Sequence, residues 1–227
     1  KLGNDYAKQV VSMALFALRK TKIDLFSGKK ITNNLSLQSF LFCISVSAIM
    51  GDVNSQIYVA YGFYKGIGFQ QKIEKAIHYY NLASDQKNAI AQCNLGIIYS
   101  DGKYTKVDIE KAISFYLHAS NQKNSIAQNN LGLIYLEGKF VKQNIKKAIE
   151  YLTLSANQKN SMAQNNLGVL YCTDKYNNKD INKSLFYLNL ALDQNNSLSQ
   201  YNFGILYLQG QYFAKDINKA IHYFTLA

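Results

Sequence analysis

The sequence predicts an all-α fold, a right-handed superhelical solenoid (an α/α superhelix) of tandem helix-turn-helix repeats. Four segments superpose without gaps at a spacing of 36 residues, beginning at Ala91, Ala127, Ala163 and Ser199. A fifth copy begins at Ser55, with Gln56, Val59 and Phe63 in matching places. Such short units cannot each bury an apolar face alone, so tandem copies at one period predict stacking into a solenoid.

Each copy contains two helical patterns joined by a short turn. In the copy at 125–160, the first pattern places four residues on one face: Ala127, Leu131, Gly132 and Tyr135. The second pattern, over 144–157, does the same with Ala148, Ile149, Leu152 and Ala156.

The turn between the two helices also recurs. A glycine stands where a helix C-terminus favours a positive φ, at Gly66, Gly102, Gly138 and Gly210. An N-cap residue then precedes the second helix, at Asp108, Asn144, Asp180 and Asp216.

The ends of the chain depart from this pattern. We expect residues 1–52 to form a divergent N-terminal cap or degenerate repeat, with helices over 5–20 and 35–52 and a loop over 21–34. Five repeats then fill 53–227, the last one truncated. Because the chain starts at Lys1 and stops within a helical pattern at Ala227, we expect a trimmed segment before it and a continuation after it.

The repeat resembles the Sel-like repeat, a relative of the tetratricopeptide repeat. The pattern of that family appears here as Ala91, Leu95, Gly96, Tyr99, Gly102, Asp108, Lys111, Ala112, Tyr116 and Ala119. The resemblance implies an adaptor or scaffold rather than an enzyme. The roles that it implies are those of quality-control adaptors, signalling scaffolds and bacterial host-interaction or effector-regulating factors.

Two glycines of the family are replaced in this chain. The second turn glycine becomes aromatic, which predicts a reshaped turn, at Tyr104, Phe140, Tyr176 and Tyr212. The glycine between repeats becomes Lys87, Lys123, Lys159 and Asn195. Either these residues or the asparagines that follow them are expected to adopt the left-handed conformation, which costs about 1 kcal/mol for a residue other than glycine.

The composition favours a soluble protein of a reducing compartment. Three cysteines are scattered without a CxxC motif, and no apolar run is long enough to cross a bilayer. We therefore expect an intracellular protein, cytoplasmic or delivered into a host cell. The formal charge of +11 raises two alternatives, an acidic protein partner and nucleic acid. Nucleic acid is disfavoured because Arg19 is the only arginine.

Catalytic and metal sites are not indicated by the sequence. His78, His118 and His222 are far apart in the repeat array, and no nucleotide-binding, hydrolase or metalloprotease motif is present. We therefore expect neither an enzyme nor a cofactor. Two repeated positions have structural interpretations, a glutamine amide ladder between repeats (Gln56, Gln92, Gln128, Gln164, Gln200) and a solvated lysine face (Lys75, Lys111, Lys147, Lys183, Lys219).

The far side of each first helix is the candidate binding surface. At 100° per residue, this side is apolar in every repeat and would line a concave groove. We predict a partner-binding groove formed by Tyr61, Tyr64, Ile97, Asn129, Leu133, Leu136, Asn165, Val169, Tyr201, Ile205 and Leu208. The alternative is that neighbouring helices cover these residues as a packing seam. The predicted function is a scaffold that binds a peptide or domain of another protein in this groove, and an electrostatic binder of nucleic acid or an anionic surface is the alternative.

Overall fold

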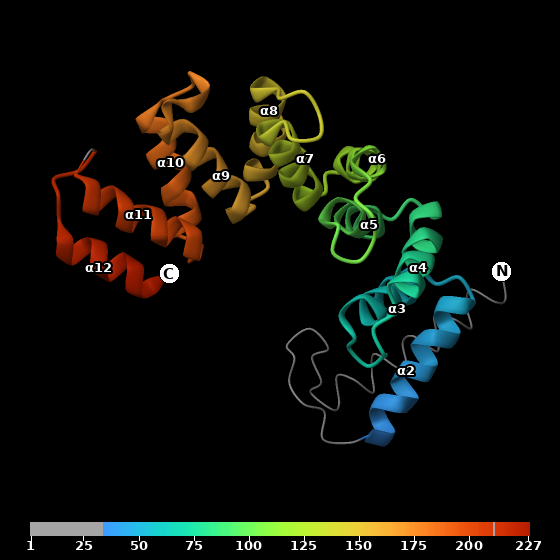
Figure 1. The fold of residues 1–227 in the computed structure, drawn as a ribbon. Coiled ribbons are helices and arrows are strands. Elements are labelled where there is room, and N and C mark those ends of the chain that lie inside the picture. Colours follow the sequence, from blue (N-terminus) through green and yellow to red (C-terminus); the bar gives the residue numbers. More distant parts are fainter. Residues whose placement is uncertain (1–33, 211) are drawn as a thin grey trace. The chain divides into compact units, whose positions relative to one another are not determined.

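Eleven α-helices, one short 3-10 helix and no β-strand make up residues 34–210 and 212–227, the part of the chain that the computed structural model describes (Figure 1). The α-helices are α2 (Asn34–Ile49), α3 (Val53–Lys65), α4 (Ile73–Asp85), α5 (Ala89–Asp101), α6 (Ile109–Asn121), α7 (Ser125–Glu137), α8 (Ile145–Asn157), α9 (Ser161–Cys172), α10 (Ile181–Leu192), α11 (Ser197–Gln209) and α12 (Ile217–Leu226). The predicted helix over 125–137 coincides with α7, and the predicted all-α repeat fold is confirmed.

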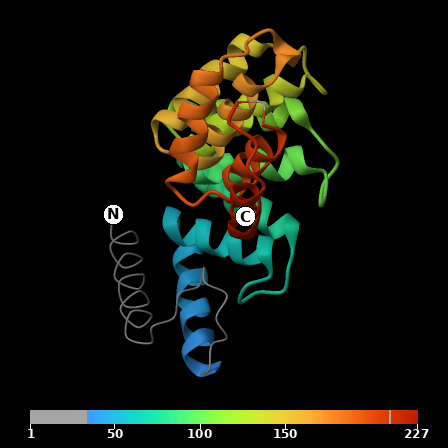
Figure 2. The same cartoon turned by 90° about the vertical axis from the view of Figure 1, so that its left-hand side faces the viewer.

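The chain forms two compact units, residues 1–119 and 120–227. In the first unit α3 pairs with α4, and α2 and α5 pack on either side of that pair. In the second unit α7 pairs with α8, α9 with α10, and α11 with α12. Figure 2 turns the view by 90°, and α11 and α12 at the C-terminal end again lie side by side.

Side chains satisfy the backbone at the helix ends, as the sequence indicates. The carboxamide oxygen of Asn144 accepts a hydrogen bond from the Lys147 backbone N–H at 2.9 Å, and Asp180 and Asp216 cap α10 and α12 in the same way. Gly138 ends α7 with φ +66°, where a Cβ atom would stand 2.5 Å from the Gln143 side chain.

Lysine, and not the following asparagine, adopts the left-handed conformation between repeats. Lys87, Lys123 and Lys159 have φ of 61°, 62° and 63°, and Asn195 takes this position once at 54°. The asparagine that follows each of them keeps an extended backbone and caps the next helix: Asn88, Asn124, Asn160 and Asn196. The alternative that these asparagines take the left-handed conformation is therefore wrong, because capping requires them to be extended.

The core lies between paired helices and between successive pairs. Leu131, Leu152 and Leu167 are 0% exposed. Gly132 lets α7 approach α8 closely, because a Cβ atom there would stand 2.6 Å from the Leu152 side chain. The face predicted to be buried is therefore the buried face, although Tyr135 at its edge is half-buried.

Stacked aromatic rings join the two helices of each repeat. The pairs are Phe63 with Tyr79, Tyr99 with Phe115, Tyr135 with Tyr151, Tyr171 with Tyr187 and Tyr207 with Tyr223, with centroids 5.7–6.2 Å apart and planes within 9°. The recurrent lysine of the second helix covers the first ring of each pair, at 4.2–5.3 Å from its centroid. The interpretation of these lysines as merely solvated was incomplete, because each one caps a ring stack while it remains exposed.

At the N-terminal end, α2 confirms the helix expected in residues 35–52. It ends at Ile49, and Asp52 then caps α3 by accepting a hydrogen bond from the Ser55 N–H at 2.7 Å. The expected helix over 5–20 and the loop that follows it lie outside the described residues, so the N-terminal cap stays a prediction.

Candidate functional site

In the unit of residues 120–227, three first helices follow one another through a ladder of asparagines. Asn166 on α9 donates a hydrogen bond to the Asn129 carboxamide oxygen on α7 at 2.9 Å. Asn202 on α11 donates to Asn165 on α9 at 2.8 Å. These bonds join α7 to α9 and α9 to α11, so the outward sides of the three helices follow one another along one surface of this unit.

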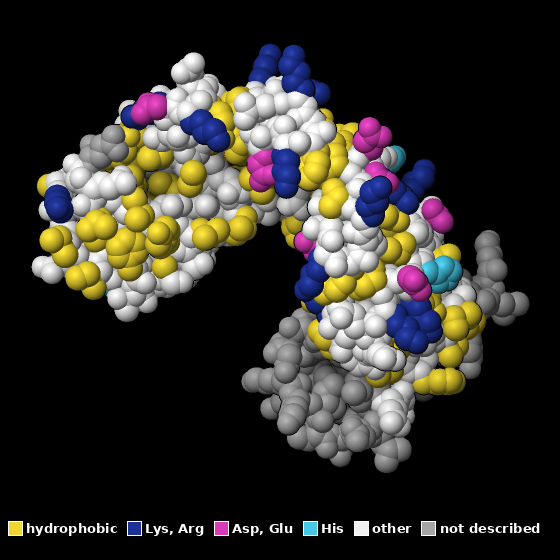
Figure 3. Space-filling model, viewed as in Figure 1, with side chains coloured by type: hydrophobic (Ala, Val, Ile, Leu, Met, Phe, Trp, Pro, Cys, Tyr) yellow, Lys and Arg dark blue, Asp and Glu magenta, His cyan; other side chains and the backbone are white. Residues whose placement is uncertain are grey.

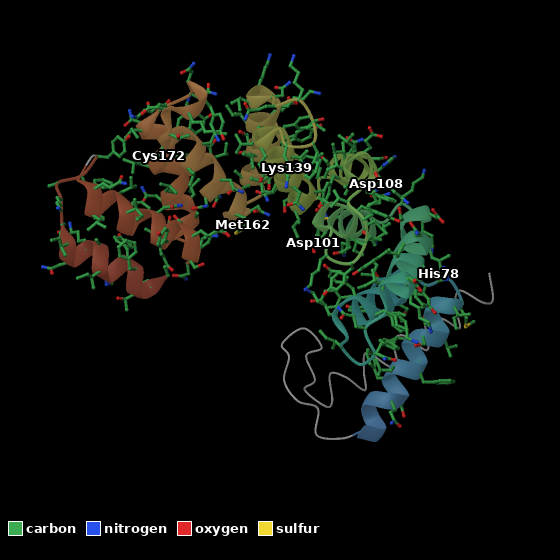
Figure 4. All side chains as sticks on the ribbon, in the orientation of Figure 1. His78, Asp101, Asp108, Lys139, Met162 and Cys172 are labelled. Atoms are coloured by element: carbon green, nitrogen blue, oxygen red, sulfur yellow. The ribbon has the colours of Figure 1, made fainter. Side chains whose placement is uncertain are left out.

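Large apolar side chains are exposed on this surface. The second residue of each of the three helices is an aliphatic side chain or methionine, and these residues are 51%, 44% and 46% exposed: Ile126, Met162 and Leu198. Val169, Tyr201 and Leu208 are exposed as well, at 44%, 51% and 42%. Leu133, Leu136 and Ile205 are half-buried. We call these nine residues the first-helix face. Figure 4 labels Met162 on α9, and Figure 3 shows hydrophobic side chains over α11.

Two predicted site residues do not belong to the accessible surface. Asn129 and Asn165 are only 7% and 4% exposed, because the asparagine of the next repeat covers each of them. Helical rotation placed them on the far side of a single helix, but it could not show that the neighbouring first helix covers them. Their expected contact with a partner is therefore corrected to a structural role that joins neighbouring repeats.

In the unit of residues 1–119, the predicted site residues Tyr61, Tyr64 and Ile97 are half-buried. The Tyr64 ring makes an edge contact with Tyr104 at 5.8 Å, and burial raises the pKa of Tyr64. Tyr61 lines a small apolar pocket whose other walls are Leu41, Ile44, Tyr58, Gly62, Ile67 and Phe69. Ile97 is therefore covered to the same degree as Leu133 and Ile205, which occupy its repeat position in the second unit.

Three of the recurrent glutamines have a structural role at the junctions between repeats. Gln128 donates to the Ser120 carbonyl oxygen at 3.3 Å and accepts from the Gln158 amide at 2.6 Å. Gln164 bonds to Ala156 and Gln194 in the same way, and Gln56 bonds to Ala48 and Gln86. The expected amide ladder between repeats is confirmed at these three positions.

Groups suited to metal binding do not occur in the described residues. These residues contain no group of three or more His, Cys, Asp or Glu side chains that could hold a metal ion. His78, which Figure 4 labels on α4, is exposed, as are His118 and His222. Within the same residues, none of the helices has the length and apolar character that a membrane span needs.

The charged turn from α7 into α8 was not among the features predicted from the sequence. Residues 137–147 contain four lysines and one carboxylate, Glu137, together with the exposed ring of Phe140. The signal was present in the sequence, since α8 is the only second helix with lysines at both its second and third residues, Lys146 and Lys147.

Comparison with known proteins identifies the repeat. Residues 53–88, 89–124, 125–160, 161–196 and 197–227 each match the Sel1 repeat. No curated protein matches the chain.

Several solved structures share the fold. A protective antigen present in uropathogenic Escherichia coli strains is 27% identical with a TM-score of 0.80, over 97% of this chain and 45% of the antigen, so the chain spans less than half of that protein. A Sel1 repeat protein from Oxalobacter formigenes is 21% identical with a TM-score of 0.76, over 94% of this chain and 80% of its own. An immunity protein from Pseudomonas aeruginosa is 16% identical with a TM-score of 0.64, over 97% of this chain and 79% of its own.

Proposed function

Because the chain belongs to the Sel1 repeat family, whose members generally mediate protein-protein interaction, we propose that it is a scaffold that binds a partner polypeptide on the first-helix face. The partner contributes apolar side chains from an extended or helical segment, which pack against the exposed aliphatic residues of α7, α9 and α11. The concave groove expected from the sequence is part of this proposal.

The observation that carries the proposal is the repetition of exposed apolar residues at one repeat position. Ile126, Met162 and Leu198 are the second residues of consecutive first helices, and each is close to half exposed. Burying such side chains against a partner contributes roughly 25 cal/mol per Å² of apolar area, whereas exposed positions are normally polar in a helical repeat. A row of three therefore favours a docking surface over a solvated one.

The asparagine ladder supports the same surface by making it rigid. Asn166 and Asn202 use their amide groups to bridge neighbouring helices, so the apolar residues on both sides of the ladder are held at fixed separations. A pre-organised surface loses less conformational entropy when a partner binds.

The direct test replaces two exposed residues of this face. Met162→Glu combined with Leu198→Glu leaves the unfolding free energy within about 0.5 kcal/mol per site, because both side chains are already 44–46% exposed. A partner captured from the source cell and identified by mass spectrometry should then bind the variant roughly tenfold more weakly or worse, since buried apolar anchors each contribute about 2 kcal/mol.

A matched control places the same charges on second helices. Leu154→Glu on α8 combined with Phe186→Glu on α10 changes side chains that are 44% and 57% exposed, away from the first-helix face. The control should bind the partner with wild-type affinity. Equal weakening by both double variants, or normal binding by the first, would show that the partner docks elsewhere.

A further inference from the structure

The net positive charge of residues 120–227 is concentrated at the turns inside the repeats. These residues contain eleven lysines and six carboxylates, and nine of the lysines and four of the carboxylates lie within 137–147, 174–183 and 215–219. The other residues of 120–227 contain two lysines and two carboxylates, so their net charge is zero. The charge is therefore a feature of one edge of each repeat rather than of the whole surface.

One of these turns lacks internal ion pairs. We call residues 137–147 the basic turn; its four lysines are Lys139, Lys142, Lys146 and Lys147. Each of the other two turns contains ion pairs: Lys179 with Asp174 at 2.8 Å and Lys183 with Asp180 at 3.2 Å in one, and Lys219 with Asp216 at 3.9 Å in the other. Within the described part of the chain, none of the four lysines of the basic turn makes an ion pair.

Two of these lysines stand where the helix itself disfavours them. Lys146 and Lys147 occupy the first turn of α8, and no acidic residue accompanies them there. The N-terminal end of a helix carries partial positive charge, so cations in the first turn reduce helix stability. The residue equivalent to Lys146 in the other second helices is Glu74, Glu110, Asn182 or Asn218, which are compatible with a helix N-terminus. Lys147 has a counterpart in every second helix, where the lysine caps a ring stack, so it is the locally unfavourable choice of Lys146 that points to a requirement outside folding.

Aromatic rings hold two of the ammonium groups in place. The Lys147 ammonium lies 5.0 Å from the centroid of Tyr135, and the Lys139 ammonium lies 4.9 Å from that of Phe140. Phe140 is itself 52% exposed, so a ring and several cations are presented to solvent together. Figure 4 labels Lys139 beside the loop that joins α7 to α8, and Figure 3 shows lysine side chains gathered over the same region.

We infer that the basic turn is a second docking surface, which binds an acidic segment of a protein partner. Carboxylates of the partner pair with the four ammonium groups, and the partial positive charge at the start of α8 adds to the attraction. The inference rests on the proposed function only in taking the ligand to be a protein. Nucleic acid is the less suitable ligand, because the described residues hold no arginine for bidentate contacts and the turn has a net charge of only +3.

The test uses the 227-residue chain and a short fluorescein-labelled poly-glutamate peptide, with Kd measured by fluorescence anisotropy at low and at physiological salt. Lys139→Gln, Lys142→Gln and Lys146→Gln are combined in one variant, which leaves the lysine that caps Tyr135 in place. We expect a roughly tenfold rise in Kd at low salt, since each exposed ion pair contributes modestly and three are lost. The difference from wild type should shrink at physiological salt.

The matched control removes the same charge from the opposite edge of the repeats. Lys87→Gln, Lys123→Gln and Lys159→Gln together lower the formal charge from +11 to +8, as the first variant does. If the control weakens peptide binding as much, net charge alone explains the attraction and the inference is overturned. If an oligothymidylate of similar length binds more tightly than the peptide and loses affinity only in the basic-turn variant, the surface is a nucleic-acid site and the inference is likewise wrong.

The proposal for the first-helix face and the inference for the basic turn can be tested separately. The Met162→Glu and Leu198→Glu variant should bind poly-glutamate like the wild type, because the glutamates lie on α9 and α11 and not on the basic turn. If this variant binds both the peptide and the captured partner with wild-type affinity, the proposed docking on the first-helix face is wrong. The inference that the basic turn binds an acidic segment would still stand.

Discussion

The amide of Gln128 is expected to stabilise the α7 and α8 repeat. Its side chain is 4% exposed, donates to the Ser120 carbonyl oxygen at 3.3 Å and accepts from Gln158 at 2.6 Å. Gln128→Met keeps the length and helix propensity of the side chain but removes both hydrogen bonds. The Ser120 carbonyl then keeps its hydrogen bond from the Lys123 backbone N–H.

The expected loss follows from the hydrogen bonds that the partners keep or regain. The Ser120 carbonyl still accepts from the Lys123 backbone N–H at 2.8 Å, and Gln158 is exposed and regains its hydrogen bond from water. Gln128→Met therefore removes two hydrogen bonds without leaving either partner unsatisfied, and we expect it to lower the unfolding free energy by about 1 kcal/mol. For a chain of this length, that is a decrease in Tm of roughly 2–4 °C, measured by circular dichroism at 222 nm.

The companion variant Gln158→Met removes the hydrogen bond between Gln128 and Gln158 but leaves the bond from Gln128 to the Ser120 carbonyl. It should cost only about 0.5 kcal/mol, because Gln158 remains near solvent, and the double variant should be less destabilised than the sum of the two single changes. If the unfolding free energy of Gln128→Met is within about 0.3 kcal/mol of that of the wild type, the amide ladder does not stabilise the junction between repeats. If Gln128→Met instead weakens partner binding at unchanged Tm, the amide belongs to a binding site.

Three further perturbations test the core, the linkers and the buried thiol. Leu131→Asp should lower the unfolding free energy, measured by urea titration, by about 3 kcal/mol or more, because a charge replaces a side chain that is 0% exposed. Tyr135→Asp should lower it by less, since Tyr135 is half-buried. Lys159→Gly should raise stability by about 0.5 kcal/mol, since φ is 63° there, whereas Lys147→Gly within α8 should lower it by about 1 kcal/mol. Burial raises the pKa of the Cys93 thiol to about 12 from 9.0, so iodoacetamide at pH 8 should modify Cys43 and Cys172 first. Because the raised pKa favours the unfolded thiolate, the unfolding free energy should also fall as pH rises from 9 towards 12, and equal labelling of all three thiols would contradict the burial of Cys93.

The repeat period predicts the helices, but it does not predict which side chains neighbouring helices bury. The bounds of α7 followed from an apolar face, a glycine and an asparagine cap, all of which act within one helix and its turn. The burial of Asn129 depends on Asn166, 37 residues away, so a single helical wheel could not reveal it. Likewise, the position of Lys147 over Tyr135 requires the rotation of α8 against α7, which only the packed pair defines.

The bonds between repeats have a consequence for the number of repeats. The Gln164 amide reaches back to the Ala156 carbonyl, and Asn166 reaches back to Asn129. Gln200 and Asn202 occupy the same positions one repeat later. If residues 161–196 were absent, Gln200 would face Ala156 and Asn202 would face Asn129 with the same donor and acceptor groups. Loss of this repeat would therefore shorten the binding surface without leaving these polar groups unpaired. The copies with Ile57, Cys93 or Tyr201 at the position of Asn129 offer no carboxamide there, so this exchange is specific to the copies that begin at Ser125 and Ser161.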